Sequence, residues 1–411
     1  MASSESPEHV WRREAPHVLG ALARRYGDWG DCEDAVQEAL LAAHDQWPGD
    51  GVPEHPRGWL VRVASRRLID ARRSQVARES REESYADHAG EVAEAPAERD
   101  DTLDVLLLCC HPVLTPASQV ALTLRAVAGL TTAQVAAAFF VPEATMAQRI
   151  SRAKKTLRDH GVGFGRVDPA ELPDRLTAAL RVLYLVLTEG HTASAGEDLV
   201  DGSLASEALR LTRDLHTRLP YDDEVTGLLA LMLLTHARRP GRVDGAGDLV
   251  PLAEQDRSRW DAAAIVEGVG LVEQVLPRGR VGRYQLQAAI AAVHAEAATF
   301  EETDWVQVVA LYRMLAEHFP DPTVTLNLAV AVAAAMGPEA GLAELAPLLD
   351  DPVLSGRHRV HAVRAHLLEE SGALADARAS YSTAARLATN VREQRYLNHR
   401  LAALDGQEAH G

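Results

Sequence analysis

The sequence predicts an all-α protein, and two observations support this prediction. Residues that favour strands are sparse and aromatic residues make up only 5% of the chain, whereas Ala, Leu, Arg and Glu fill most segments. With 411 residues and 47% hydrophobic content, the chain is long enough for about two to four domains. We expect three folded parts, residues 1–78, 103–162 and 163–411, with an acidic flexible linker over residues 79–102.

The first part is expected to contain several amphipathic helices, divided by a turn over residues 48–51. A helix that begins near Pro56 buries one apolar face, and its other face is rich in arginine. The candidate nucleic-acid contacts on this helix are Trp59, Arg62, Arg66, Arg67 and Arg73. Such a face suits a phosphate backbone and an unpaired base that stacks on Trp59. An ordinary salt-bridged surface helix explains the same pattern.

Acidic residues cluster over residues 31–38, in the run Asp-Cys-Glu-Asp-Ala-Val-Gln-Glu. A carboxylate cluster suits metal binding or acid–base chemistry, but we interpret this one as a protein-binding face. Its acids lie at the start of a predicted helix, where the helix dipole favours negative charge. That preference alone is the simpler alternative.

The linker separates this part from the next. From Glu79 to Asp101 the chain has nine acidic residues and two basic ones, with almost no large apolar side chains, which is typical of a solvated tether. The net charge of the whole chain is −17, yet residues 57–78 hold seven arginines and one acid. Because local charge decides where DNA docks, the acidic total does not exclude DNA as a partner.

Residues 131–160 predict a helix, a short turn and a basic helix. Thr131 and Gln134 form a capping box, and Pro142 separates the two helices. A helix can lie in the major groove only if its outer face offers donors at positions i, i+3, i+4 and i+7. That spacing holds here, and Lys155 suits a phosphate, so the candidate contacts are Thr145, Gln148, Arg149, Arg152 and Lys155. A solvated basic helix in a bundle is the alternative.

The third part predicts stacked helical hairpins. Residues 304–319 and 374–388 resemble each other at an offset of 69 residues, with Tyr312 matching Tyr381 and Ala310 matching Ala379. This offset is nearly twice the roughly 34-residue period of tetratricopeptide (TPR) repeats. We therefore expect a TPR-like α-solenoid.

Several classes of function find no support in the sequence. The three cysteines, Cys32, Cys109 and Cys110, have neither disulfide-framework nor zinc-site spacing and are expected in the core. No P-loop, GxSxG or HExxH motif occurs. We expect no enzymatic activity, no cofactor and no metal. The apolar runs are too short for a membrane span, so a cytoplasmic protein is expected.

Three motifs in order resemble the sigma-70 family: residues 31–38, residues 56–70 and residues 141–154. Their spacing is similar to that of the extracytoplasmic-function (ECF) class, which keeps the two domains called region 2 and region 4. Leu106-Leu-Leu-Cys-Cys-His-Pro112 and the run over residues 281–294 resemble the subgroup with a C-terminal TPR extension.

The resemblance implies a role for each motif. Glu33, Asp34, Gln37 and Glu38 match the helix that docks on the clamp of the beta-prime subunit of core RNA polymerase, and region 4 implies contact with the flap of the beta subunit. Residues 59–73 match the helix that recognises and opens the minus-ten element, although Ser65 and Arg66 depart from the common class pattern. Residues 145–155 match the minus-thirty-five recognition helix. A small DGPF-motif protein or another regulator is implied as a partner of the extension.

We therefore predict an ECF sigma factor that binds core polymerase and directs initiation at promoter DNA, with a regulatory extension. The first alternative is a one-component helix-turn-helix regulator that senses a ligand or protein through its repeats. The second is a repeat-protein scaffold or enzyme without a DNA role.

Overall fold

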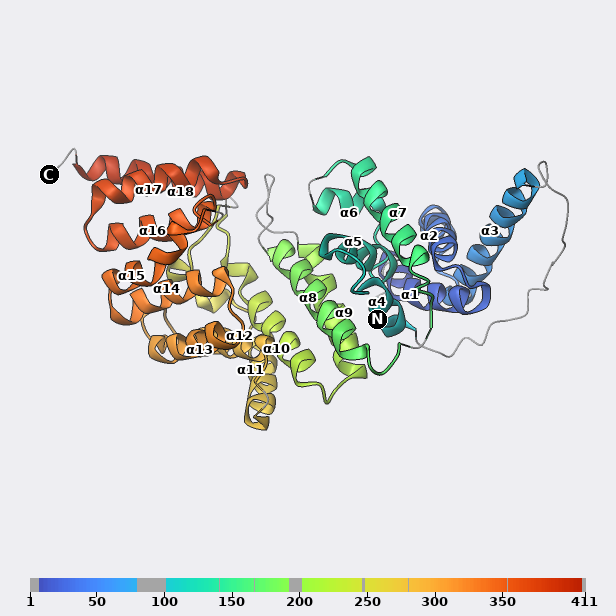
Figure 1. Cartoon of the computed structure of the whole chain (residues 1–411), viewed down its shortest axis with the longest axis horizontal. Coiled ribbons are helices and arrows are strands. Elements are labelled where there is room, and N and C mark those ends of the chain that lie inside the picture. The colour runs from blue at the N-terminus through green and yellow to red at the C-terminus, as the bar shows by residue number, and fades with distance from the viewer. Residues whose placement is uncertain are drawn as a thin grey trace. The chain divides into compact units, whose positions relative to one another are not determined.

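A computed structural model of the chain describes residues 7–79, 101–139, 141–165, 167–191, 202–245, 248–279, 281–352 and 354–408. Within these ranges the regular structure is helical, apart from one isolated bridge between Val243 and Leu249 (Figure 1). The all-α prediction is confirmed. None of the helices described is both long and apolar enough to cross a membrane. The chain forms two compact units, Met1–Leu185 and Val186–Gly411.

The first unit contains seven complete helices among its described residues and the first part of an eighth. They are α1 (Pro7–Tyr26), α2 (Trp29–Asp50), α3 (Pro56–Glu79), α4 (Thr102–Cys109), α5 (Pro116–Ala126), α6 (Thr132–Ala138), α7 (Glu143–Asp159) and α8 (Leu172–His191). The first three pack against one another as a bundle. The predicted acidic linker lies almost wholly outside the described residues, and its last residues, Asp101 and Thr102, are buried.

Helix α2 begins and ends at recognisable signals. The Asp28 side chain accepts a hydrogen bond from the Asp31 amide as N-cap, and Gly51, with φ of 83°, ends the helix. The turn expected over residues 48–51 is therefore late by about one helical turn, because α2 continues through Pro48 to Asp50. Pro48 lacks a backbone donor, but the last turn of α2 is still closed, because the Gly51 amide donates to the Trp47 carbonyl at 3.0 Å.

Local signals also place α6 and α7. The Thr131 hydroxyl accepts from the Gln134 amide, and the Gln134 side chain accepts from the Thr131 amide, so the predicted capping box is confirmed. Pro142 precedes α7 as its N-cap residue. The apolar side of α7 is buried as predicted, through Met146, Ile150, Ala153 and Leu157. These two helices position the candidate recognition face.

The three cysteines lie in the core as predicted, because Cys32, Cys109 and Cys110 are all buried. Burial raises the pKa of Cys32 to about 12 and that of Cys110 to about 12. These thiols are uncharged near neutral pH and behave as small apolar core groups.

The second unit holds the end of α8 and ten further α-helices among the described residues. They are α9 (Gly202–Arg218), α10 (Asp223–Ala237), α11 (Ala262–Val275), α12 (Arg283–Glu296), α13 (Trp305–His318), α14 (Pro322–Met336), α15 (Pro338–Asp350), α16 (His358–Glu370), α17 (Leu374–Leu387) and α18 (Val391–Glu408). Short 3₁₀ turns lie at Arg239–Gly241, Leu252–Glu254, Arg257–Arg259 and Leu276–Arg278.

From α12 onward, each helix packs on its neighbour in sequence (Figure 1). Three hydrophobic clusters follow one another, the first across α12 to α14, the second across α14 to α16 and the third across α16 to α18. Helices α14 and α16 each contribute to two clusters. The apolar cores thus run on without a break along this part of the chain.

Candidate nucleic-acid interface and acidic face

Helix α3 presents its arginines to solvent. Leu60, Ala64 and Leu68 are buried on its inner side. The arginines predicted to contact nucleic acid are all exposed on the other side, namely Arg62, Arg66, Arg67 and Arg73. Guanidinium groups held in this way are available to phosphates.

Two residues of α3 close to this face, Trp59 and Ser65, are partly or fully buried. Trp59 is half-buried and its ring meets that of Trp47 edge-on, with 5.5 Å between centroids. Its position therefore depends on the bundle core as well as on any ligand. Ser65, where the sequence departs from the class pattern, is buried and lies away from the exposed arginines.

Helix α7 presents the second candidate face. Thr145, Gln148, Arg152 and Lys155 are exposed, and Arg149 is half-buried. Together they form the outer side of a helix whose inner side is buried. The arrangement of α6, a short connection and α7 is the geometry by which a helix-turn-helix offers its second helix to a major groove.

The acidic motif of α2 is divided between surface and interior. Asp34 and Glu38 are exposed, whereas Glu33 has 0% of its surface exposed and Gln37 has 6%. All four were predicted to contact polymerase. The structure places two of them at the surface and two beneath other helices, and the assignment itself stays a prediction.

The groups that cover Glu33 come from α5 and α7. Arg125 Nε lies 3.0 Å from one Glu33 carboxylate oxygen, and Lys154 Nζ lies 2.5 Å from the other. Lys154 also pairs with Asp34 at 2.6 Å. Gln37 Nε2 donates a hydrogen bond to the Arg125 carbonyl at 3.0 Å. The acidic face of α2 is therefore matched to two cations of the same chain.

The charge states in this cluster support one another. Burial alone would lower the pKa of Lys154, but the charges of Glu33 and Asp34 more than offset it and raise the pKa above its ordinary value. Lys154 is therefore cationic at neutral pH. Its neighbour Lys155 points elsewhere and pairs with Asp159 on α7 at 2.7 Å.

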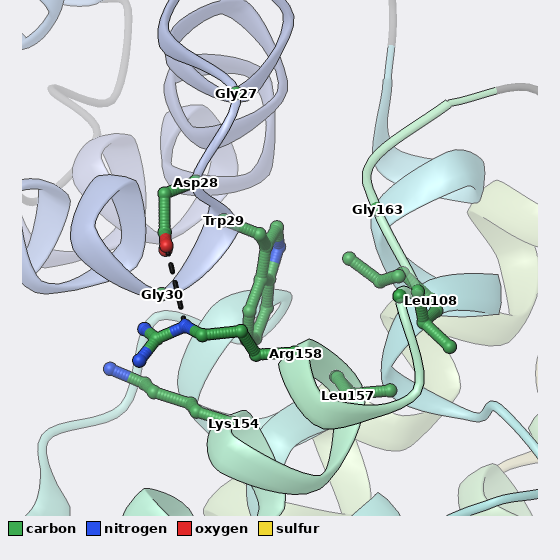
Figure 2. A pocket seen from close by; sticks show the side chains of 11 residues that line it. Gly27, Asp28, Trp29, Gly30, Leu108, Lys154, Leu157, Arg158 and Gly163 are labelled. Atoms are coloured by element: carbon green, nitrogen blue, oxygen red, sulfur yellow. Dashed lines mark ion pairs between the residues drawn. The ribbon is translucent and has the colours of Figure 1, made fainter.

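A cavity of about 210 Å³ lies beside this contact. Figure 2 shows Trp29 on one side of it and Leu108, Leu157 and Gly163 on the other. Lys154 lines it, as does Arg158, whose Nε lies 3.4 Å from the Asp28 carboxylate. Packing between α2 and α7 is thus incomplete next to the Glu33 ion pairs.

Sequence reasoning did not identify Arg125, Lys154 or Asp28 as parts of a single site. On α7, Lys154 and Arg158 face α2 and pair with Glu33 and Asp28. The only available signal was charge complementarity between distant segments, and such a signal has many possible pairings.

Comparison with known families assigns three segments of the chain. Residues 10–78 match the family described as Sigma-70 region 2, and residues 104–157 match Sigma-70, region 4. Residues 175–276 match a family of unknown function, DUF6596.

Relatives among known proteins agree with these matches. An uncharacterized protein of Rhizobium meliloti (strain 1021) is 39% identical over 406 residues, which is 96% of this chain and 95% of the relative. The ECF RNA polymerase sigma factor SigL of Mycobacterium tuberculosis is 35% identical over 146 residues, 34% of this chain and 81% of SigL. The probable ECF RNA polymerase sigma factor SigI of the same organism is 30% identical over 178 residues, 42% of this chain and 60% of SigI. No solved structure matches the chain.

Proposed function

Since this chain belongs to the ECF family of RNA polymerase sigma factors, we propose that it binds core RNA polymerase and directs it to promoters with two recognition elements. The observation that carries the proposal is that α3 and α7 each combine a buried apolar side with an exposed side of cations and hydrogen-bond donors. The mechanism proposed is one of binding and positioning, with no enzymatic step.

The proposed promoter contacts follow from these faces. On α7, Arg149 and Arg152 suit guanine edges and Gln148 suits adenine, while Lys155 suits a phosphate. On α3, the exposed arginines and Trp59 suit the phosphates and an unstacked base of the opened minus-ten strand. Because DNA binding by sigma factors uses both elements, neither helix alone is expected to specify a promoter.

The proposed polymerase contact is the acidic face of α2. Asp34 and Glu38 are exposed, and they pair with Lys154 and Arg67 of the same chain. The proposed binding exchanges these partners for a cationic surface on the beta-prime clamp. Region 4 is proposed to meet the flap of the beta subunit, and the protein to act in the cytoplasm.

We also propose that the second unit is a TPR-like array that regulates or supports the first. Helices α13, α15 and α17 begin at Trp305, Pro338 and Leu374, which are 33 and 36 residues apart, close to the ~34-residue TPR period. Tyr312 and Tyr381 both pack into hydrophobic clusters. A DGPF-motif protein is the kind of partner proposed for this array.

Transcription with purified core polymerase tests the main proposal. Core plus this chain should give run-off transcripts of defined length from a random-sequence promoter library, and core alone should not. A helix-turn-helix regulator would bind DNA but give no transcripts, which would favour that alternative.

A truncated chain, residues 1–191, tests the role proposed for the second unit. It should keep all of α8, because Arg181 on α8 donates to Gln119, and Gln119 holds the carbonyls of Cys110 and His111. Transcription below that of the full chain would mark the second unit as supportive, and transcription above it would mark the unit as inhibitory. Equal transcription would contradict a regulatory role.

A further inference from the structure

We propose that in the free protein α5 and α7 occupy the acidic face of α2, so that region 4 blocks the polymerase-binding surface of region 2 until an ion-pair latch opens. The latch consists of Glu33 and Asp34 on α2 with Arg125 on α5 and Lys154 on α7. This inference rests on the proposed function, because it takes the acidic face of α2 as the polymerase contact.

The burial of Glu33 carries the argument. A buried carboxylate needs compensating charge, and both cations within reach come from helices beyond residue 101. Gln37 is held in the same way by the Arg125 carbonyl. A partner that needs Glu33 and Gln37 cannot touch them while α5 and α7 are in place.

Other contacts keep the same helices together. Arg24 of α1 pairs with buried Asp101, directly before α4. A Cβ added at Gly20 would clash with the Asp101 side chain, so only glycine allows this approach. The latch is thus the edge of a larger closed contact that includes α1 and α4.

The ion pairs of the latch determine which helices meet, but they contribute little net free energy to the closed arrangement. The carboxylate oxygens of Glu33 form ion pairs but no well-aligned hydrogen bonds. The desolvation of buried charges offsets much of their attraction, and the pocket of about 210 Å³ beside Lys154 leaves part of the contact between α2 and α7 unpacked. A contact of this kind can be exchanged for a competing cationic surface.

The chain between α3 and α4 is long enough for region 2 and region 4 to separate. Glu79 ends α3 and Thr102 begins α4, and the intervening residues can span at most about 3.3–3.6 Å each, roughly 70–80 Å in total. Asp34 remains 67% exposed as a side chain. We place the first encounter with polymerase at Asp34, followed by release of Lys154.

The latch can be probed with a reagent that joins a lysine to a carboxylate, because the chain has few lysines. Lys154 and Lys155 are its only lysines. A carbodiimide activates an Asp or Glu carboxylate, the lysine amine attacks, an amide forms and the reagent leaves as its urea. Lys154 should be joined to Asp34, and Lys155 should be joined to Asp159, which is its partner within α7.

The first test is this cross-link on the full-length protein, mapped by mass spectrometry with and without saturating core polymerase. The Lys154–Asp34 product should form in the free protein and fall at least about five-fold with core, a population shift of about 1 kcal/mol. The Lys155–Asp159 product should form equally in both samples, as an internal control. An unchanged Lys154–Asp34 yield with bound core would overturn the latch.

The second test compares two full-length variants that each remove one cation from an ion pair. Lys154→Gln opens the latch, and Arg175→Gln removes the α8 partner of Glu171, which directly precedes that helix. In a fluorescence assay without DNA, Lys154→Gln should bind core polymerase several-fold more tightly than wild type, and Arg175→Gln should bind like wild type. Equal or weaker binding by a folded Lys154→Gln variant refutes the inference. Failure of wild type to bind core at all would instead refute the proposed function.

Discussion

Helices α3 and α7 carry similar side chains and differ in what lies beside them. On α3 the outward arginines have one carboxylate contact among the ion pairs described, Arg67 to Glu38 at 3.6 Å. On α7 the cations divide between two directions, since Lys155 faces solvent while Lys154 is held by α2. Clusters of cations on a helix therefore do not form a single surface, and their spacing decides which of them are free for DNA.

The largest expected effect concerns the buried sides of the two helices. Leu68→Ala on α3 and Met146→Ala on α7 should each lower the free energy of unfolding by about 2–5 kcal/mol, because both leave a cavity in a packed core. Urea denaturation measures this. Leu41→Ala, at a residue that is 54% exposed, should change it by less than about 0.5 kcal/mol. Equal effects at all three positions would contradict the assigned burial.

A smaller effect separates the outer faces. Arg149→Ala with Arg152→Ala should weaken promoter binding by about 1–3 kcal/mol for each base that the removed guanidinium recognised, and should relax the preference for the minus-thirty-five sequence. Arg62→Ala with Arg66→Ala should mainly reduce the salt dependence of binding, by about 0.9 in the log–log slope per phosphate contact. Binding of the polymerase complex to promoter fragments over a salt series tests both.

The control for these pairs is Arg239→Ala with Arg386→Ala, which removes two exposed arginines of the second unit. Wild-type binding is expected for this variant. If all three pairs behaved alike, general charge rather than the two faces would explain binding.

The smallest effect concerns the start of α6. Thr131→Ala removes the capping-box acceptor and should lower stability by about 1 kcal/mol. Thr156→Ala removes a hydroxyl that donates to the Arg152 carbonyl, which already accepts within α7, so it should cost less. Thermal unfolding measures the loss of stability in both variants. A larger loss for Thr156→Ala than for Thr131→Ala would argue against the capping box as the interaction that fixes the start of α6.

Local signals account for what the sequence could predict. The capping box at Thr131, Pro142 and the apolar spacing of α7 all act within a few residues, and each is confirmed. The fold class followed from composition in the same way. The two segments that resemble each other, residues 304–319 and 374–388, coincide with α13 and α17, because Asp304 is the N-cap of α13 and Ala388 is the C-cap of α17.

Tertiary contacts account for what the sequence could not predict. Glu33 reads as an exposed acid at the start of a helix, and only packing of α5 and α7 buries it. Asp101 reads as the end of a solvated acidic run and is buried beside Arg24. In both cases the deciding partner is more than 75 residues away, so no local pattern predicts it.

Permanganate footprinting on a promoter selected in the run-off assay tests the central claim most directly. With core polymerase and the wild-type chain, we predict protection around the minus-thirty-five element together with reactive, unpaired thymines near minus ten. Arg62→Ala with Arg66→Ala should lose the reactive thymines and keep the upstream protection. Protection of a single segment by the wild-type protein, with no opened DNA, would contradict the assignment of α3 and α7 to one initiation complex.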